Sequence, residues 1–227
     1  VLVDDCSPTD PTPQIKEFFD RVRFFPNPVN LGFTRSFNRL LKLSRGKYTL
    51  VLNSDMELLP DSITEMLKTE ERLKGEAVLG GRLYFPDMRS QDSISYLPTP
   101  WGAFKEYFLG LKGSYFMYVA KAEVLTKVEV IVGACMFIPR SVMNKVGYFT
   151  QSVVSYFEDI EYCRKINESG FKIYYLPIAK VTHLHGGSGA PTKYLVESSK
   201  KYHGLFKYYI FTFILWLGQK INYKRSL

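Results

Sequence analysis

Four small groups of acidic, amide or histidine side chains are the residues whose types and spacing could do chemistry. They are Asp4-Asp5, Asn53-Ser54-Asp55, Glu158-Asp159 and the pair His183 and His185. Carboxylates and imidazoles can hold a divalent cation, contact a phosphate-linked ligand or transfer a proton. Each group also has a structural explanation: a solvated turn, a charged helix start, or an ordinary edge-strand histidine pair.

Together the groups fit group transfer from a diphosphate leaving group. Negative charge develops on the diphosphate as the sugar–phosphate bond breaks, and a cation held by Asp55 would offset it as a Lewis acid. His183 and His185 are two residues apart and face the same way in an extended strand, so one of them is a candidate metal ligand or phosphate contact. Asp159 is the candidate base for an attacking hydroxyl, and Glu158 is the less favoured partner.

These groups are expected at the ends of strands or at the start of a helix. Residues 48–52 form a short apolar run that stops abruptly at Asn53, as a buried strand of an α/β sheet does. In open α/β sheets ligands bind outside the carboxyl ends of the strands, which would place most of the four groups on one rim. The alternative for Asp55 is a cap for the helix that starts near Pro60.

The first third of the chain alternates strand–helix–strand–helix–strand, which predicts a parallel sheet with right-handed crossovers. Residues 86–127 show no clear period and are interpreted as a variable excursion. The predicted strands are residues 1–3, 22–25, 48–52, 77–79, 82–85, 128–138, 172–176 and 179–184. The predicted helices are residues 14–20, 34–44, 61–74, 140–146 and 155–169.

Composition limits the class of protein and its partners. The chain has 227 residues, 46% of them hydrophobic and 23% charged, which is enough for one large globular domain. The net charge of +8 favours acidic partners, and we expect phosphorylated substrates and an anionic membrane surface rather than nucleic acid. Cys6, Cys135 and Cys163 are widely spaced, which implies no disulfide or zinc framework and fits a reducing cytosol.

The tail from about Tyr194 is predicted to be helical, which divides the chain into residues 1–193 and 194–227. Residues 208–219 carry no formal charge but are fewer than the roughly 18 apolar residues of a spanning helix. Lysines on both sides of this run favour a helix lying in a bilayer interface. The alternative is a helix that covers the sheet or forms a homodimer.

Six stretches, taken in their order and spacing, point to a family. The ordered set resembles the family 2 glycosyltransferases of the GT-A fold, most closely their bacterial rhamnosyltransferase-like branch. The resemblance covers residues 1–188 apart from the excursion at 86–127. The six stretches are VLVDDCSPTD, NLGFTRSFNRLL, YTLVLNSDMEL, VGACMFIPR, YFEDIEYCRKINESGFKIYYLP and KVTHLHGGS.

The resemblance implies a fold and an activity. The fold is an α/β, Rossmann-like and mostly parallel sheet flanked by helices, with a C-terminal amphipathic helix. The family's first strand would precede Val1, and we expect that it has been cut away or lies outside this chain. The activity is inverting transfer of a sugar, L-rhamnose being one candidate, from dTDP-rhamnose or a UDP-sugar with Mg²⁺ or Mn²⁺. The acceptor is a hydroxyl of a saccharide or a lipid-linked saccharide in polysaccharide biosynthesis. The expected location is the cytoplasmic side of the plasma membrane.

The resemblance also implies roles for residues. Asp159 is the expected base, beside Glu158, and the family's Asp-x-Asp metal motif reads Asn53-Ser54-Asp55 here. The implied metal ligands are Asp55, His183 and His185. The implied nucleotide-sugar contacts are Asp4, Asp5, Asn30, Gly32, Asn53, Asp55, Gly133 and Ala134. Trp101 and Tyr156 are the candidate acceptor contacts.

Two other functions are considered. One is a nucleotidyltransferase on a similar sheet. The other is a degenerate, non-catalytic domain of the same fold that binds a membrane or a partner, which the Asn at position 53 favours and the retained Asp55, Asp159 and His183 disfavour.

Overall fold

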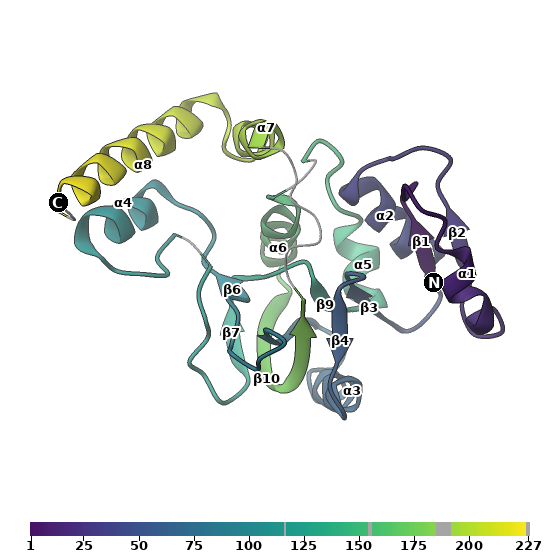
Figure 1. Cartoon of the computed structure of the whole chain (residues 1–227). Coiled ribbons are helices and arrows are strands. Elements are labelled where there is room, and N and C mark those ends of the chain that lie inside the picture. The colour runs from purple at the N-terminus through teal and green to yellow at the C-terminus, as the bar shows by residue number, and fades with distance from the viewer. Residues whose placement is uncertain (116, 154–155, 185–191, 226–227) are drawn as a thin grey trace.

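The protein is described by a computed structural model that covers residues 1–115, 117–153, 156–184 and 192–225 (Figure 1). Its strands are β1 (Leu2–Asp4), β2 (Phe24–Pro26), β3 (Tyr48–Leu52), β4 (Met56–Leu58), β5 (Ala77–Tyr84), β6 (Ile94–Ser95), β7 (Thr126–Val128), β8 (Val130–Ile131), β9 (Cys135–Pro139) and β10 (Lys172–His183). Its helices are α1 (Thr12–Ile15), a 3-10 turn (Lys16–Phe18), α2 (Phe33–Leu43), α3 (Ser62–Arg72), α4 (Pro100–Leu109), α5 (Arg140–Val146), α6 (Glu158–Glu168), α7 (Thr192–His203) and α8 (Leu205–Arg225).

The centre of the molecule is a mixed sheet. Its strand order is β3-β9-β5-β10-β4, and β7 also pairs with β10. Strands β5 and β10 run parallel, whereas β3, β4, β7 and β9 run antiparallel to the described neighbours with which they pair. The predicted α/β fold is confirmed, but the sheet is mixed rather than mostly parallel. Sequence periodicity indicates which strands are buried and carries little information about their direction.

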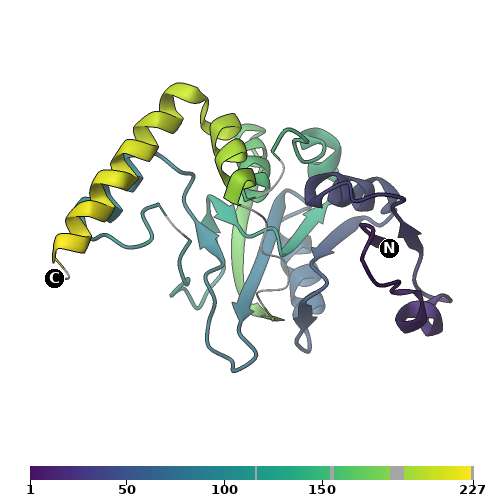
Figure 2. The same ribbon diagram turned by 45° about the horizontal axis from the view of Figure 1, so that its top comes forward.

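Helices cover both faces of this sheet and make two apolar cores. Helices α2, α5 and α6 contribute Phe37, Val142 and Tyr162 to one core, and α3 contributes Met66 to the other. Figure 1 shows α3 below the sheet and the other three helices above it, and Figure 2 shows the molecule with its top turned forward. Strands β1 and β2 pair in parallel as a separate two-stranded sheet, and in both views they lie at the opposite end of the molecule from α8.

Two predicted strand breaks are wrong. Residues 77–85 were expected to form two strands around Gly80-Gly81, yet β5 runs through both glycines. A Cβ at Gly80 would lie 2.8 Å from Ile131 Cγ2, so glycine here permits close packing rather than a turn. Similarly, residues 172–183 form the continuous strand β10, whose pairing with β5 shifts register between Leu176 and Lys180.

The excursion at 86–127 contains regular structure that the sequence analysis did not predict. Helix α4 begins after Thr99, whose side chain accepts a hydrogen bond from the Gly102 N–H at 2.9 Å, and it ends at Gly110, whose φ is 69°. These are ordinary helix-capping residues. They were overlooked because the segment between them is rich in aromatic residues and lacks a clear apolar stripe.

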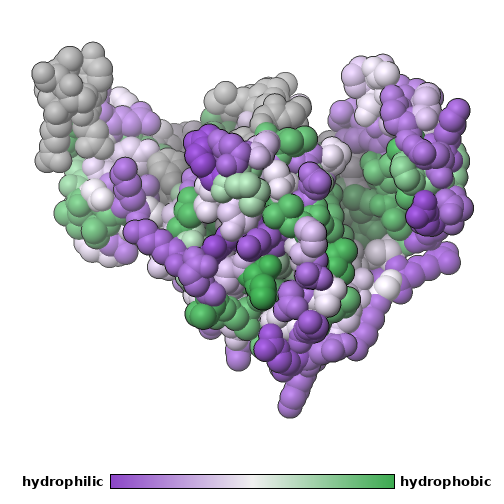
Figure 3. Space-filling view, turned by 60° about the horizontal axis from the view of Figure 1, so that its bottom comes forward, coloured by the Kyte–Doolittle hydropathy of each residue, from purple (hydrophilic) through white to green (hydrophobic). Residues whose placement is uncertain are grey.

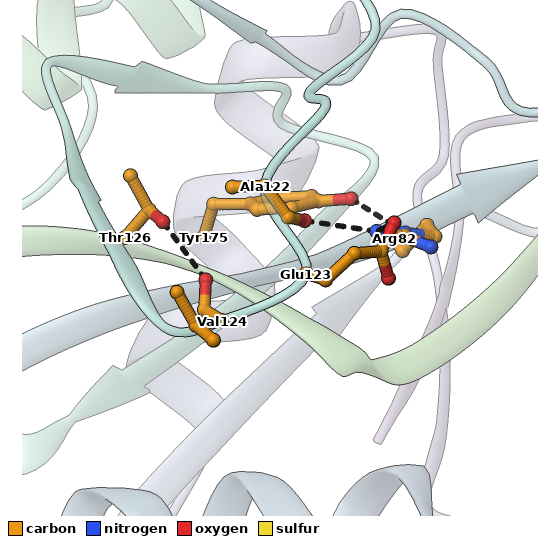
Figure 4. Close-up of polar contacts among 6 residues, drawn as sticks. All are labelled: Arg82, Ala122, Glu123, Val124, Thr126 and Tyr175. Atoms are coloured by element: carbon orange, nitrogen blue, oxygen red, sulfur yellow. Dashed lines mark hydrogen bonds and ion pairs between the residues drawn. The ribbon is translucent and has the colours of Figure 1, made fainter.

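Arg82 ties the end of the excursion to the sheet (Figure 4). Its guanidinium donates hydrogen bonds to the Tyr175 hydroxyl on β10, to the Ala122 carbonyl and to the Glu123 carboxylate, at 2.8, 2.9 and 2.8 Å. The ion pair with Arg82 lowers the pKa of Glu123. Arginine is well suited to this position because its planar guanidinium can donate hydrogen bonds to several acceptors at once.

The predicted C-terminal helices are present, as α7 and α8. Helix α8 packs against α4, and α7 packs against α8. Among the described residues, no helix combines the length and the apolar character that crossing a membrane requires. Whether residues 1–193 and 194–227 form separate units stays a prediction; α7 already begins at Thr192.

Candidate active site

Asp55 and His183 form the first part of the candidate site. Asp55 lies in the turn between β3 and β4, and His183 is the last residue of β10, which pairs antiparallel with β4. His183 Nε2 lies 3.4 Å from Asp55 Oδ2, and the Asp55 carbonyl accepts a hydrogen bond from the Leu184 N–H at 2.9 Å. The structure therefore brings together two residues that are 128 positions apart and that the sequence assigned to one site.

Gln91 orients the His183 ring. The Gln91 side-chain Nε2 donates to the His183 carbonyl at 2.8 Å, so its Oε1 must be the atom that faces His183 Nδ1 at 3.0 Å. Because an amide oxygen can only accept, Nδ1 must carry the hydrogen. In the neutral ring, Nε2 then carries its lone pair on the side of the Asp55 carboxylate. A cation or a proton would stabilise this arrangement.

The turn after β3 connects this pair to the second part of the site, which is Asp159 with its neighbour Glu158. The Asn53 N–H donates to the Ala134 carbonyl at 3.1 Å, and the neighbouring Gly133 N–H donates to Asp159 Oδ2 at 3.0 Å. A Cβ on Gly133 would lie 3.2 Å from Asp159 Cβ, so glycine allows this close approach. Residues 132–134 separate β8 from β9, where the sequence predicted one continuous strand.

Asp159 and Glu158 begin helix α6. Besides Gly133, the Ile160 N–H donates to the Asp159 carboxylate at 2.8 Å. Burial raises the pKa of Asp159, and the N–H groups of Gly133 and Ile160 oppose this shift. Burial and then the charge of Asp159 raise the pKa of Glu158 to about 8. A pKa raised in this way makes a carboxylate a stronger base near neutral pH, as proton abstraction from a hydroxyl requires.

The predicted nucleotide contacts near the N-terminus form a separate group. Asp5 Oδ1 accepts hydrogen bonds from the Leu31 N–H and the Asn27 side chain, both at 2.8 Å. Asn30 Oδ1 accepts from the Gly32 N–H at 3.0 Å, and Gly32, with φ of 81°, precedes α2. Asp4 accepts from Ser7. No described hydrogen bond or ion pair joins this group to Asp55 or Asp159.

The other predicted site residues lie in different surroundings. Trp101 is 62% exposed on α4, whose main partner is α8, and its ring stacks on Phe104. Tyr156 is exposed two residues before Glu158 and has a φ of 77°, which is strained for a residue with a side chain. His185 lies outside the described residues. The acceptor roles of Trp101 and Tyr156 stay predictions.

A metal cage made wholly of protein is absent from the part of the chain that is described. No three His, Cys, Asp or Glu residues there gather closely enough to hold an ion. The buried Asn53 Oδ1 atom, however, has no hydrogen-bond partner among the described residues. Asn53, Asp55 and His183 thus offer an amide oxygen, a carboxylate and an imidazole nitrogen, a set that suits a divalent cation completed by water and phosphate oxygens.

Gln91 is the residue that the sequence analysis missed. It lies in the excursion, and its buried side chain reaches a histidine 92 positions away. A polar residue between Ser90 and Asp92 resembles any turn residue, so no local signal marks it. A prediction that β5 pairs with β10 could have found it. The Gln91 N–H donates to the Leu83 carbonyl on β5, and the neighbouring strand β10 ends at His183.

Comparison with known proteins indicates the family of the chain. A family model described as "Glycosyl transferase family 2" matches residues 1–147, which include Asp55 and Gly133. An N-acetylglucosaminyl-diphospho-decaprenol L-rhamnosyltransferase of Mycobacterium tuberculosis is 26% identical over 220 residues, covering 88% of this chain and 72% of that protein. An uncharacterized protein of Sinorhizobium fredii is 26% identical over 177 residues, but this chain spans 19% of its length.

Solved structures show the same fold. The crystal structure of GalNAc-T7 with UDP, GalNAc and Mn²⁺ superimposes with a TM-score of 0.64 at 16% identity, over 88% of this chain and 41% of that one. At this identity the likeness concerns the fold, which is that of GT-A glycosyltransferases. With the family model matching well over half of its residues, the chain belongs to glycosyl transferase family 2.

Proposed function

We propose that the protein is an inverting glycosyltransferase that uses a nucleotide-diphosphate sugar and a divalent cation. The observation that carries the proposal is the continuous set of contacts from His183 and Asp55, through Asn53 and Gly133, to Asp159. These contacts support our proposal of a cation site and a base on one rim of the sheet, where donor and acceptor would meet.

The donor end of the site is proposed at Asp55 and His183. A Mg²⁺ or Mn²⁺ ion held by Asp55 and His183, with Asn53 beside it, would offset the charge on the departing diphosphate. Asp4, Asp5, Asn30 and Gly32 would contact the nucleotide. We propose dTDP-rhamnose as the donor, supported by the rhamnosyltransferase among the relatives. A UDP-sugar is the other outcome of the test.

The chemical step is proposed as a single displacement. The acceptor hydroxyl oxygen bonds to the anomeric carbon while the bond from that carbon to the diphosphate breaks, and the diphosphate leaves with the electron pair. Asp159 accepts the proton of the hydroxyl. Attack opposite the leaving group inverts the configuration. The Gly133 and Ile160 N–H groups hold the Asp159 carboxylate, and each oxygen keeps lone pairs for the substrate.

The proposed acceptor is a saccharide, or a lipid-linked saccharide of a cell-surface polysaccharide. The relative from M. tuberculosis is named for transfer to N-acetylglucosaminyl-diphospho-decaprenol, which supports a lipid-linked acceptor. Such acceptors lie in a membrane. We therefore propose that the protein works on the cytoplasmic side of the plasma membrane.

The variant Asp159→Asn tests the base. It should lower the transfer rate at least 100-fold, because general-base catalysis contributes about 10² to 10⁴, while donor affinity changes little. The transfer rate is measured as release of dTDP or UDP, and donor affinity by calorimetric titration. The matched control is Asp20→Asn, at an exposed aspartate that pairs with Arg21. Loss of donor affinity together with activity in Asp159→Asn would contradict the assignment.

A further inference from the structure

Helix α8 presents an unusually apolar face to solvent. Phe206, Tyr209, Phe213 and Trp216 follow one another at steps of three or four residues, so they lie along one stripe of the helix. These four side chains and that of Leu205 are more exposed than large apolar side chains usually are. The exposed fractions are Leu205 62%, Phe206 79%, Tyr209 62%, Phe213 59% and Trp216 50%.

The opposite face of α8 packs against other parts of the protein. Phe211 is 2% exposed and packs against Tyr115 and His203, with ring centroids 5.5 and 4.1 Å apart. Gly218 lies so close to Tyr107 on α4 that a Cβ would come within 2.6 Å of it. These contacts fix the rotation of α8, so the exposed stripe is a defined surface of the folded protein.

Five adjoining large apolar side chains exposed on one helix face indicate an interaction surface. Figures 1 and 2 show α8 projecting to one side of the sheet, with α4 beside it. In Figure 3 hydrophobic residues are visible at this same end of the molecule. The surface is therefore presented away from the central sheet, where a large partner can reach it.

Helix α8 and the residues just before it carry positive charge. Residues 198–227 contain six Lys and Arg residues and no Asp or Glu. Lys220 Nζ lies 4.2 Å from the centroid of the Trp216 ring, at the edge of the stripe. If two copies met through this face, their lysines would be brought together, whereas an anionic surface would neutralise them. Aromatic side chains flanked by lysines are typical of helices that lie in the interface of an anionic bilayer.

We propose that α8 docks on an anionic lipid bilayer through Phe206, Tyr209, Phe213 and Trp216, lying parallel to the membrane plane. This proposal rests on the proposed function, which it deepens, because it names the surface that would bring the enzyme to a lipid-linked acceptor. Helix α7, which directly precedes α8, contacts a residue next to the site. Tyr202 and His203 at the end of α7 pack on Phe157, the residue before Glu158.

Vesicle binding tests the apolar part of the surface. The full chain is sedimented with vesicles of phosphatidylcholine alone or with phosphatidylglycerol, and the double variant Phe213→Ser/Trp216→Ser is compared with it. The matched control is Phe18→Ser/Phe19→Ser, which removes two exposed aromatics at the other end of the molecule. We expect binding to the anionic vesicles that falls at least tenfold in the α8 variant and stays unchanged in the control.

Charge reversal tests the electrostatic part. Lys207→Glu/Lys220→Glu should weaken binding to anionic vesicles and reduce its dependence on salt. Lys16→Glu/Lys145→Glu has the same net charge and should bind more tightly than the α8 pair. Circular dichroism checks that each variant is folded. Equal losses in the two pairs would contradict a defined docking surface.

Two further results would overturn the proposal. One is no binding of the wild type to anionic vesicles at low salt. The other is a wild-type dimer in analytical ultracentrifugation that Phe213→Ser/Trp216→Ser converts to monomer, since the face would then bind a second copy. Transfer to a water-soluble acceptor should persist in this variant, so a failed docking proposal is distinguishable from a failed proposed function.

Discussion

At the scale of single residues, the chemistry of the site depends on which nitrogen of His183 carries the hydrogen. Gln91 decides this through two hydrogen bonds, one to the His183 carbonyl and one from Nδ1. Without Gln91 the ring could turn or take the other tautomer, and Nε2–H would then face Asp55. Partners of this kind often matter to a metal site nearly as much as its ligands do.

The variant Gln91→Met keeps the side-chain volume and removes both hydrogen bonds. We expect Mn²⁺ affinity, measured with saturating nucleoside diphosphate, to fall about 10- to 100-fold, the usual cost of losing such a partner. The control Gln14→Met changes an exposed glutamine on α1 and should leave the affinity unchanged.

Nitrogen NMR of the imidazole rings gives a second readout, because the chain has three histidines. In the metal-free wild type, His183 should be protonated at Nδ1 whenever the ring is neutral. A neutral ring protonated at Nε2 would contradict the role assigned to Gln91.

Individual site residues could be predicted from the sequence where they follow an obvious strand or start a helix. Asp55 follows the apolar run of β3, and Asp159 stands in the first turn of α6 with other acidic residues. The sequence could not show that Asn53 and Gly133 join these two places, because hydrogen bonds between distant backbone segments leave no local pattern. It missed Gln91 for the same reason.

At the scale of secondary structure, the contact between α4 and α8 has a specific requirement at one position. Gly218 faces Tyr107, and a Cβ would lie 2.6 Å from both Cβ and Cδ1 of that tyrosine. The Cβ atom of Tyr107 is attached directly to the backbone of α4, so it cannot move aside unless the helix moves. A residue that would ordinarily weaken a helix is therefore needed for the two helices to approach each other.

The variant Gly218→Ala should be destabilising. In an exposed helix this change stabilises by about 1 kcal/mol, but overpacking at Tyr107 should instead cost about 1–3 kcal/mol. The melting temperature, measured by calorimetry, should fall by roughly 2–4 °C for each kcal/mol. Thr212→Ala, at an exposed position of the same helix, should not lower it. A higher melting temperature for Gly218→Ala would show that α4 and α8 do not pack as described.

Most helices and strands could be predicted, and the exceptions have different causes. Helix α5 begins and ends as predicted, because its apolar positions and the following Gly147 mark it locally. The break expected within β5 does not occur, because Gly80 and Gly81 pack closely against Ile131 and Ala179 rather than forming a turn. Strand β10 is also continuous, with a register shift between Leu176 and Lys180. Helix α4 could have been predicted from its capping residues, Thr99 and Gly110, but its irregular apolar pattern obscured it. Packing between distant segments thus determined the course of β5, whereas local capping residues delimit α4.

At the scale of the whole molecule, a helix-covered mixed sheet carries a polar rim, and α8 extends from one side of it. The fold class followed from alternating strands and helices, whereas strand direction in the sheet did not, because buried strands look alike in either direction. Our central claim about the whole molecule, which we propose above, is that this polar rim binds a nucleoside diphosphate through a cation held by Asp55.

The most direct test of that claim is calorimetric titration of the protein with dTDP and with UDP, each with and without Mn²⁺. We predict that one of the two nucleotides binds and that Mn²⁺ strengthens its binding at least tenfold, about 1.4 kcal/mol. In Asp55→Ala the dependence on Mn²⁺ should be lost. Binding that is equally strong without Mn²⁺, or no binding of either nucleotide, would contradict the account.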